Sequence, residues 1–141
     1  MAVADGNGLP IAVAIADGSR GEASLVEETL ESRFTRRTPQ RLIGDKAYDS
    51  TKLEGALKAK RIELISPQIR TRADHQRRAT RRRQDGRPLR RYRRRWKIER
   101  LWAWLLRFRR ITTRYEVRAT NFLALIHIAC ASMLLRRLAG L

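Results

Sequence analysis

Two acidic residues, Asp45 and Glu99, lie in sequence surroundings where a negatively charged carboxylate could take part in catalysis. Asp45 lies in residues 44–49, whose sequence is Gly-Asp-Lys-Ala-Tyr-Asp, directly after the apolar pair at 42–43. Glu99 lies in residues 93–100, a stretch that contains four arginines. Carboxylates on so basic a chain favour divalent-metal chemistry on a polyanion, since hard oxygen ligands and phosphate co-ligands suit such ions. Metal-dependent phosphoryl transfer usually uses a third acid, and its place in this sequence is not obvious.

Each acid also has a plain structural interpretation. Asp45 fits a turn or a helix cap, and without other context this interpretation is favoured, although Asp45 has no evident local partner. Asp49 directly precedes a predicted helix start and fits capping well. Tyr92, Arg95 and Glu99 are spaced i, i+3, i+7 and would share one face of a helix. On that face Glu99 borders the core, and an Arg95–Glu99 ion pair would be of small energy.

Composition indicates the class of partner. The 141 residues contain 32 Lys+Arg and 14 Asp+Glu, which gives a formal charge of 32 − 14 = +18 and a pI near 11.6. Arginine outnumbers lysine, and its planar fork binds phosphate bidentately. Such a balance favours nucleic acid as the partner. The single cysteine, Cys130, excludes an intramolecular disulfide and a cysteine-rich metal site.

The N-terminal part of the sequence predicts alternating strands and helices. Apolar runs at 1–4 and 11–16 flank a turn-rich segment, as in a β-hairpin. Capping-box patterns at 24–27 and 51–54 predict helices that extend to about Phe34 and about Lys60. Short strands are expected at 41–44 and 62–65. The order β-β-α-β-α-β favours an α/β fold with one mixed sheet flanked by helices, in a single domain over 1–141.

The C-terminal part is basic and helical. Residues 68–89 predict a basic loop, and 90–139 predict C-terminal helices. The last of these, from about Thr120 to Leu138, is interpreted as a buried helix, because its apolar run at 122–135 is shorter than the roughly 20 residues of a membrane span. Before it, apolar residues at helical spacing predict a core-facing stripe. That stripe contains Ile98, Leu101, Trp102, Leu105 and Phe108, whereas Trp104 lies off it and is the better candidate for a partner contact.

Several of these segments together resemble the insertion-sequence DDE transposases. Residues 44–49 strongly resemble the motif around their second catalytic aspartate, and Tyr92, Arg95 and Glu99 match the spacing of the Y-R-E signature around their catalytic glutamate. Residues 108–116 resemble the tail that follows the glutamate, and 121–123 resemble the start of the last helix. The turn at 5–10 resembles the hairpin before the second aspartate. The resemblance spans nearly the whole chain.

The resemblance implies an incomplete ribonuclease H-like fold with a helical C-terminal part. It also implies that Asp45 and Glu99 are catalytic and hold Mg²⁺ (or Mn²⁺) in a two-metal arrangement. The implied partners are the terminal repeats of an insertion sequence and target DNA. The candidate DNA-binding residues are Tyr92, Arg95, Lys46, Arg94, Arg100, Arg107 and Arg110.

Two departures from the family pattern matter. The basic residue that usually follows the glutamate by seven positions is Leu106 here; Arg107 or Arg110 could replace it, although Arg107 points about 100° away around a helix. The family's first aspartate lies on a strand before the hairpin, and Asp5 and Asp17 match turn positions instead. We therefore expect a chain without its first strand, poorly stable and inactive without the upstream part of the transposase. A decayed copy and the second frame of a frameshifted gene both fit.

The leading functional hypothesis is DNA transposition, by metal-dependent strand cleavage and transfer at insertion-sequence ends, in the bacterial cytosol at the nucleoid and without membrane association. A non-catalytic remnant that competes for transposon ends is the alternative. A ribosome-associated or RNA-binding protein is a third possibility, but phosphate binding alone gives Asp45 and Glu99 no purpose. Association into homo-oligomers is left open.

Overall fold

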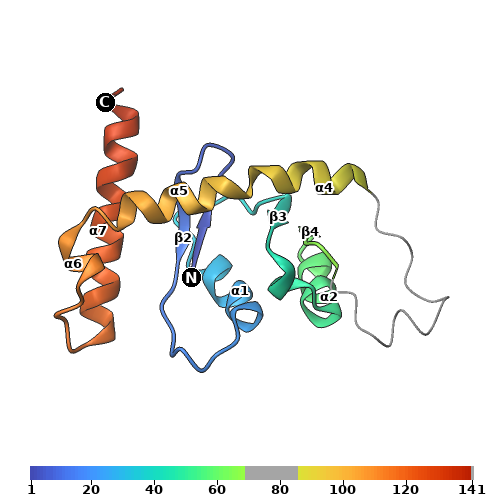
Figure 1. Ribbon diagram of the computed structural model, residues 1–141, viewed down its shortest axis with the longest axis horizontal. Coiled ribbons are helices and arrows are strands. Elements are labelled where there is room, and N and C mark those ends of the chain that lie inside the picture. The colour runs from blue at the N-terminus through green and yellow to red at the C-terminus, as the bar shows by residue number, and fades with distance from the viewer. Residues whose placement is uncertain (69–85, 141) are drawn as a thin grey trace. The chain divides into compact units, whose positions relative to one another are not determined.

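The computed structural model describes residues 1–68 and 86–140, and these residues form two compact units. Unit 1 combines Met1–Thr38 with Trp96–Leu141, and unit 2 is Pro39–Arg95. Each unit holds one pair of strands and its own helices, most of which are labelled in Figure 1. Asp45 therefore belongs to unit 2 and Glu99 to unit 1.

Unit 1 begins with the predicted β-hairpin. Strand β1 (Ala2–Ala4) pairs antiparallel with β2 (Pro10–Val13), so that Ala2 faces Val13. Asp5 closes the turn, because its Oδ1 accepts hydrogen bonds from the backbone N–H groups of residues 7 and 9, both at 2.8 Å. Asp5 is thus a turn residue, as its sequence position predicted.

Three helices pack on this hairpin, α1 (Glu22–Glu31), α5 (Trp96–Leu105) and α7 (Ala119–Leu138), and the short helix α6 (Arg109–Thr112) packs on α7. Helix α5 contacts β1, and α7 contacts both β2 and α5 (Figure 1). The core lies between these elements and is formed by Val13, Leu101, Leu105, Ile126, Ala129 and Cys130. The apolar stripe predicted for α5 is confirmed at Leu101 and Leu105, but Trp102 is 36% exposed, so its assignment to the core was wrong.

Helix α7 differs from the buried helix expected from the sequence. It has 20 residues, and an 18-residue stretch of it has a mean hydropathy of 1.4, yet only 17% of that stretch is buried. Ile126, Ala129 and Cys130 face the core, whereas Ile128 and Leu138 are 65% and 84% exposed. The reason is geometric, since a single face of the helix meets β2 and α5. Within the described residues it is also the one helix whose length and composition would allow it to cross a membrane.

Unit 2 contains a parallel strand pair. Strands β3 (Arg41–Ile43) and β4 (Glu63–Ile65) are joined through the short 3₁₀ helix η1 (Lys46–Tyr48) and helix α2 (Thr51–Ala59). Helix α2 packs on β4 and buries Leu53 and Leu57. After residues 69–85 the unit ends with α4 (Gly86–Tyr92) and the 3₁₀ helix η2 (Arg93–Arg95).

The sheet differs from the prediction of one mixed sheet. The described strands form two separate two-stranded sheets, one antiparallel and one parallel. Strands of three or four residues make few ladder hydrogen bonds, and each described strand is paired along one edge alone. The element order was predicted correctly, but which strands pair depends on tertiary packing.

Helix boundaries also moved, for local reasons. Helix α1 begins at Glu22, and Ser24 Oγ donates to the Gly21 carbonyl at 2.7 Å instead of capping the helix. Helix α2 is capped by Ser50, whose Oγ accepts from the Leu53 N–H, so neither Asp49 nor a Thr51 capping box sets its start. The basic loop predicted at 68–89 lies largely outside the described residues, and the helix expected from Arg90 already begins at Gly86.

Candidate functional site

Asp45 stands at the carboxyl end of β3, where the strand turns into η1. The N–H of Gly44 donates to the Ile65 carbonyl at 3.0 Å, which extends the parallel pair up to the turn. Asp45 Oδ1 then accepts from the Ala47 N–H at 2.9 Å and caps η1. The capping interpretation is confirmed, and the expectation that Asp45 lacks a local partner was wrong. The cap uses Oδ1 and leaves Oδ2 directed elsewhere.

The turn that carries Asp45 is held by a contact that the sequence analysis missed. A Cβ atom at Gly44 would lie 2.8 Å from the Tyr48 ring, so the ring packs directly on the glycine backbone. A larger residue at position 44 would displace Tyr48 and with it the turn. The usable signal was the glycine itself, because a close approach of a side chain to the backbone requires a residue without a Cβ atom.

Arg95 and Tyr92 share unit 2 with Asp45. Arg95 Nη1 lies 3.7 Å from Asp45 Oδ2, and the Arg95 guanidinium lies 6.0 Å from the centre of the Tyr92 ring. The two ion-pair side chains are 36% and 38% exposed, so the pair contributes about 1 kcal/mol or less to stability. The pair matters for chemistry, because the Arg95 guanidinium lies beside Asp45 Oδ2, the carboxylate oxygen that does not cap η1. Lys46 and Arg94 are exposed on the same unit.

Glu99 lies in the first turn of α5 in unit 1. Its side chain is exposed, so the prediction that it borders the core was wrong. The prediction assumed one continuous α-helix, whereas η2 interrupts the helix at Arg93–Arg95. A 3₁₀ segment has about 3.0 residues per turn instead of 3.6, so the i, i+3, i+7 spacing of Tyr92, Arg95 and Glu99 does not define one helical face.

Arg100 holds the tip of the hairpin. Its Nη2 donates to the Asn7 carbonyl at 2.6 Å, and the neighbouring Lys97 Nζ donates to the Gly6 carbonyl. The guanidinium lies over the rings of Trp96 and Trp104, at 4.7 and 4.9 Å from their centres. This expected phosphate ligand therefore has a structural task within unit 1.

The basic residues after Glu99 also differ in their contacts. Arg110 Nη1 lies 3.2 Å from Glu116 Oε1, and the Glu116 side chain is only 10% exposed. Arg107 is exposed and lines a pocket, while Leu106 is 52% exposed. Both proposed substitutes for the basic residue are therefore exposed, but Arg110 is ion-paired with Glu116, whereas Arg107 lines a pocket.

Comparison with known proteins decides the family. The model of the transposase DDE domain matches residues 1–134. The chain belongs to this transposase family. A Burkholderia cepacia protein whose name assigns it as the transposase for insertion sequence element IS402 is 31% identical over 136 residues, which are 91% of this chain and 58% of that protein. The chain thus spans little more than half the length of this relative, and no solved structure matched.

Membership of the DDE transposases gives the acids their context. The family acts on DNA and generally uses a divalent metal. In residues 1–68 and 86–140, however, no three histidine, cysteine or acidic side chains gather closely enough to hold a metal ion. The donor chemistry fits a hard cation at Asp45, which has a carboxylate oxygen outside its cap. The described residues of this transposase domain thus contain no complete set of metal ligands.

Proposed function

We propose that this chain takes part in DNA transposition by metal-dependent strand cleavage and transfer at the ends of an insertion sequence. The observation that carries the proposal is the Asp45 turn, in which Arg95 and Tyr92 accompany the acid, within a family match over residues 1–134. The proposed substrates are the terminal repeats and target DNA, in the cytosol.

Asp45 and Glu99 are the proposed ligands of Mg²⁺ or Mn²⁺. When bound, two such ions activate water or a DNA 3′-hydroxyl and stabilise the leaving oxygen of an in-line displacement. In the unit 2 contact the Arg95 guanidinium neighbours Asp45 Oδ2. Asp45 would hold the cation through Oδ2, and the neighbouring Arg95 guanidinium could bind a backbone phosphate. Tyr92, whose ring lies beside Arg95, would limit the positions that the guanidinium can take.

The third acid is proposed to come from another part of the transposase. Two observations support this, namely the lack of a three-acid group among the described residues and the greater length of the IS402 relative. A chain of this kind would contribute DNA affinity and two ligands, and the remaining part would complete the site.

A non-catalytic protein that occupies transposon ends is the second candidate. Leu106 favours it, because the position that usually carries a cation is apolar here and half exposed. Such a protein would bind the ends with the same salt-sensitive affinity without cutting them.

Cleavage of labelled insertion-sequence ends distinguishes the two candidates. The full chain is incubated with these ends and Mg²⁺ or Mn²⁺, with and without the remaining part of the transposase. We expect cleavage in the reconstituted mixture, lost in Asp45→Asn and in Glu99→Gln and retained in Glu54→Gln, an exposed control on α2. If the reconstituted wild type cuts and both acid variants still cut equally well, the site assignment is wrong. If the reconstituted wild-type protein binds the ends but does not cut them, the non-catalytic candidate is supported.

A further inference from the structure

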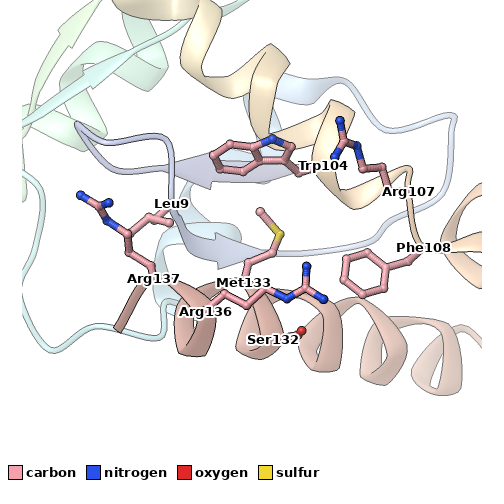
Figure 2. A pocket seen from close by; sticks show the side chains of 8 residues that line it. All are labelled: Leu9, Trp104, Arg107, Phe108, Ser132, Met133, Arg136 and Arg137. Carbon is pink, nitrogen blue, oxygen red and sulfur yellow. The ribbon is translucent and has the colours of Figure 1, made fainter. Parts of the chain in front are cut away.

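Unit 1 has a pocket of about 450 Å³ that the proposed metal chemistry does not use. Its walls come from the hairpin tip, the C-terminal end of α5 with the residues that follow it, and the last turns of α7 (Figure 2). The lining side chains are Leu9, Trp104, Arg107, Phe108, Ser132, Met133, Arg136 and Arg137. A volume of this size lies within the range of small-ligand sites, roughly 300 to 1,000 Å³.

The pocket combines flat apolar surfaces with positive charge. Trp104 and Phe108 are half-buried, and Met133 lies between them in Figure 2. Arg107, Arg136 and Arg137 surround this apolar centre and are exposed, and none of the described residues that line the pocket is acidic. An occupant must therefore offer both a flat apolar face and negative charge.

A second hollow of about 390 Å³ adjoins the first and shares Leu9, Trp104 and Arg137 with it. It adds the cations of Lys97 and Arg100, so positive charge continues along the surface from one hollow to the next. This continuity suits a chain of repeating negative groups better than an isolated anion.

We propose that the pocket binds one unpaired nucleotide of a DNA strand, with the base against Trp104 and Phe108 and the flanking phosphates on Arg107, Arg136 and Arg137. In a duplex both faces of a base are covered by its neighbours, so only an unpaired base can stack on an aromatic side chain. Phosphates supply the repeating negative charge. The inference rests on the proposed function and adds the form of DNA that this surface recognises.

Equilibrium binding of the full chain to labelled oligothymidylate and to a duplex of equal length, without metal, tests this proposal. Trp104→Ala should weaken single-strand binding about tenfold and leave duplex binding nearly unchanged, because base–aromatic stacking is worth roughly 1–3 kcal/mol. Trp104→Phe should restore most of the affinity. Trp102→Ala, an exposed tryptophan of the same helix outside the pocket, is the matched control and should have little effect.

Because Trp104 is half-buried, a second variant avoids the risk of misfolding. Arg136→Gln combined with Arg137→Gln alters two exposed side chains and should flatten the single-strand salt slope by about 1.4. Arg109→Gln combined with Arg118→Gln is the control, because it removes two positive charges from exposed positions outside the pocket. It should change the salt slope of single-strand binding less. Equal slopes for the two double variants, equal losses on both DNA forms, or polyglutamate binding as tight as oligothymidylate would overturn the proposal. If one of these results is obtained but duplex binding remains salt-sensitive, the nucleotide-binding proposal fails and the proposed function in transposition is retained. If the wild-type chain binds neither form of DNA, both proposals are overturned.

Discussion

At the residue scale, the structure gives several candidate residues a second task. Asp45 caps η1 through Oδ1 while its other oxygen faces Arg95, and Arg100 clamps the hairpin while lying between two tryptophans. Functional and structural roles therefore have to be separated by substitutions that preserve one and remove the other.

Asp45 allows such a separation. Asp45→Asn keeps an oxygen that can accept from the Ala47 N–H, so its stability should stay near that of the wild type. Asp45→Ala loses the cap and should lower the free energy of unfolding by about 1 kcal/mol. Urea unfolding measures both, and equal destabilisation by the two changes would show that the cap does not stabilise the turn. Both variants should lack metal-dependent cleavage under the conditions proposed above.

Leu106 lies at the position where the family resemblance leads us to expect a basic residue. Because its side chain is 52% exposed, Leu106→Lys should leave stability nearly unchanged. It should tighten duplex DNA binding and steepen the dependence of log affinity on log salt by about 0.9, as one more phosphate contact would. Salt titration of DNA binding provides the measurement. Leu106→Gln removes the apolar side chain without adding charge, and an equal gain in this control would exclude a phosphate contact.

At the element scale, the hairpin and α5 stabilise each other. The turn depends on Gly8, whose φ of +82° suits glycine, and whose backbone lies against the Arg100 guanidinium. Because Arg100 and Lys97 both donate to carbonyls of this turn, the position of α5 on β1 and the shape of the turn are coupled.

Gly8→Ala should therefore destabilise the protein by about 1–2 kcal/mol, the usual cost of a left-handed conformation for a residue with a Cβ atom. Gly6→Ala, two residues earlier in the same turn, is the matched control, since nothing lies within 4 Å of a Cβ there. Thermal unfolding of the two variants should show a lower midpoint for Gly8→Ala alone. An equal loss in both would contradict the role of the left-handed conformation at Gly8, since reduced freedom of the unfolded chain would by itself stabilise both alanine variants.

At the scale of the whole molecule, a charge of +18 acts on every association. It favours polyanions at long range and makes affinity depend on ionic strength. Repulsion among the positive charges opposes the compact state, and the core of unit 1 that resists it is small. Helix α7 buries only one face against this core. Opening of this core can be followed at a single buried group, the Cys130 thiol.

Cys130 is the single cysteine and is 1% exposed, and burial raises the pKa of its thiol from 9.0 to about 11. Alkylation by iodoacetamide near neutral pH should therefore be slow in the native protein and fast in denaturant. The unfolded thiol loses its proton at lower pH than the folded one, so this group's contribution to stability should fall as pH rises from about 9 to about 11. Rapid native alkylation at pH 8 would show that unit 1 opens readily, and Cys130→Ala is the control for the pH effect.

Local sequence determined the features that rest on neighbouring residues. The hairpin, the turn role of Asp5, the positions of most helices and the family motif follow from turn chemistry, helical spacing and specific residue types. The basic composition by itself indicated a polyanionic partner. These features involve contacts over a few residues, or depend on total charge alone.

Only the tertiary structure decided the rest. It distributed the strands over two sheets and left most of α7 exposed. It also placed the Arg95 guanidinium beside Asp45 Oδ2 and brought Arg100 to the Asn7 carbonyl, more than 90 residues away in the chain. A periodic apolar pattern shows which face of a helix can be buried, but the area that is covered depends on which elements reach it. The same limit applies to charge, because a guanidinium that can bind phosphate can equally bind a carbonyl or a carboxylate brought near by the fold.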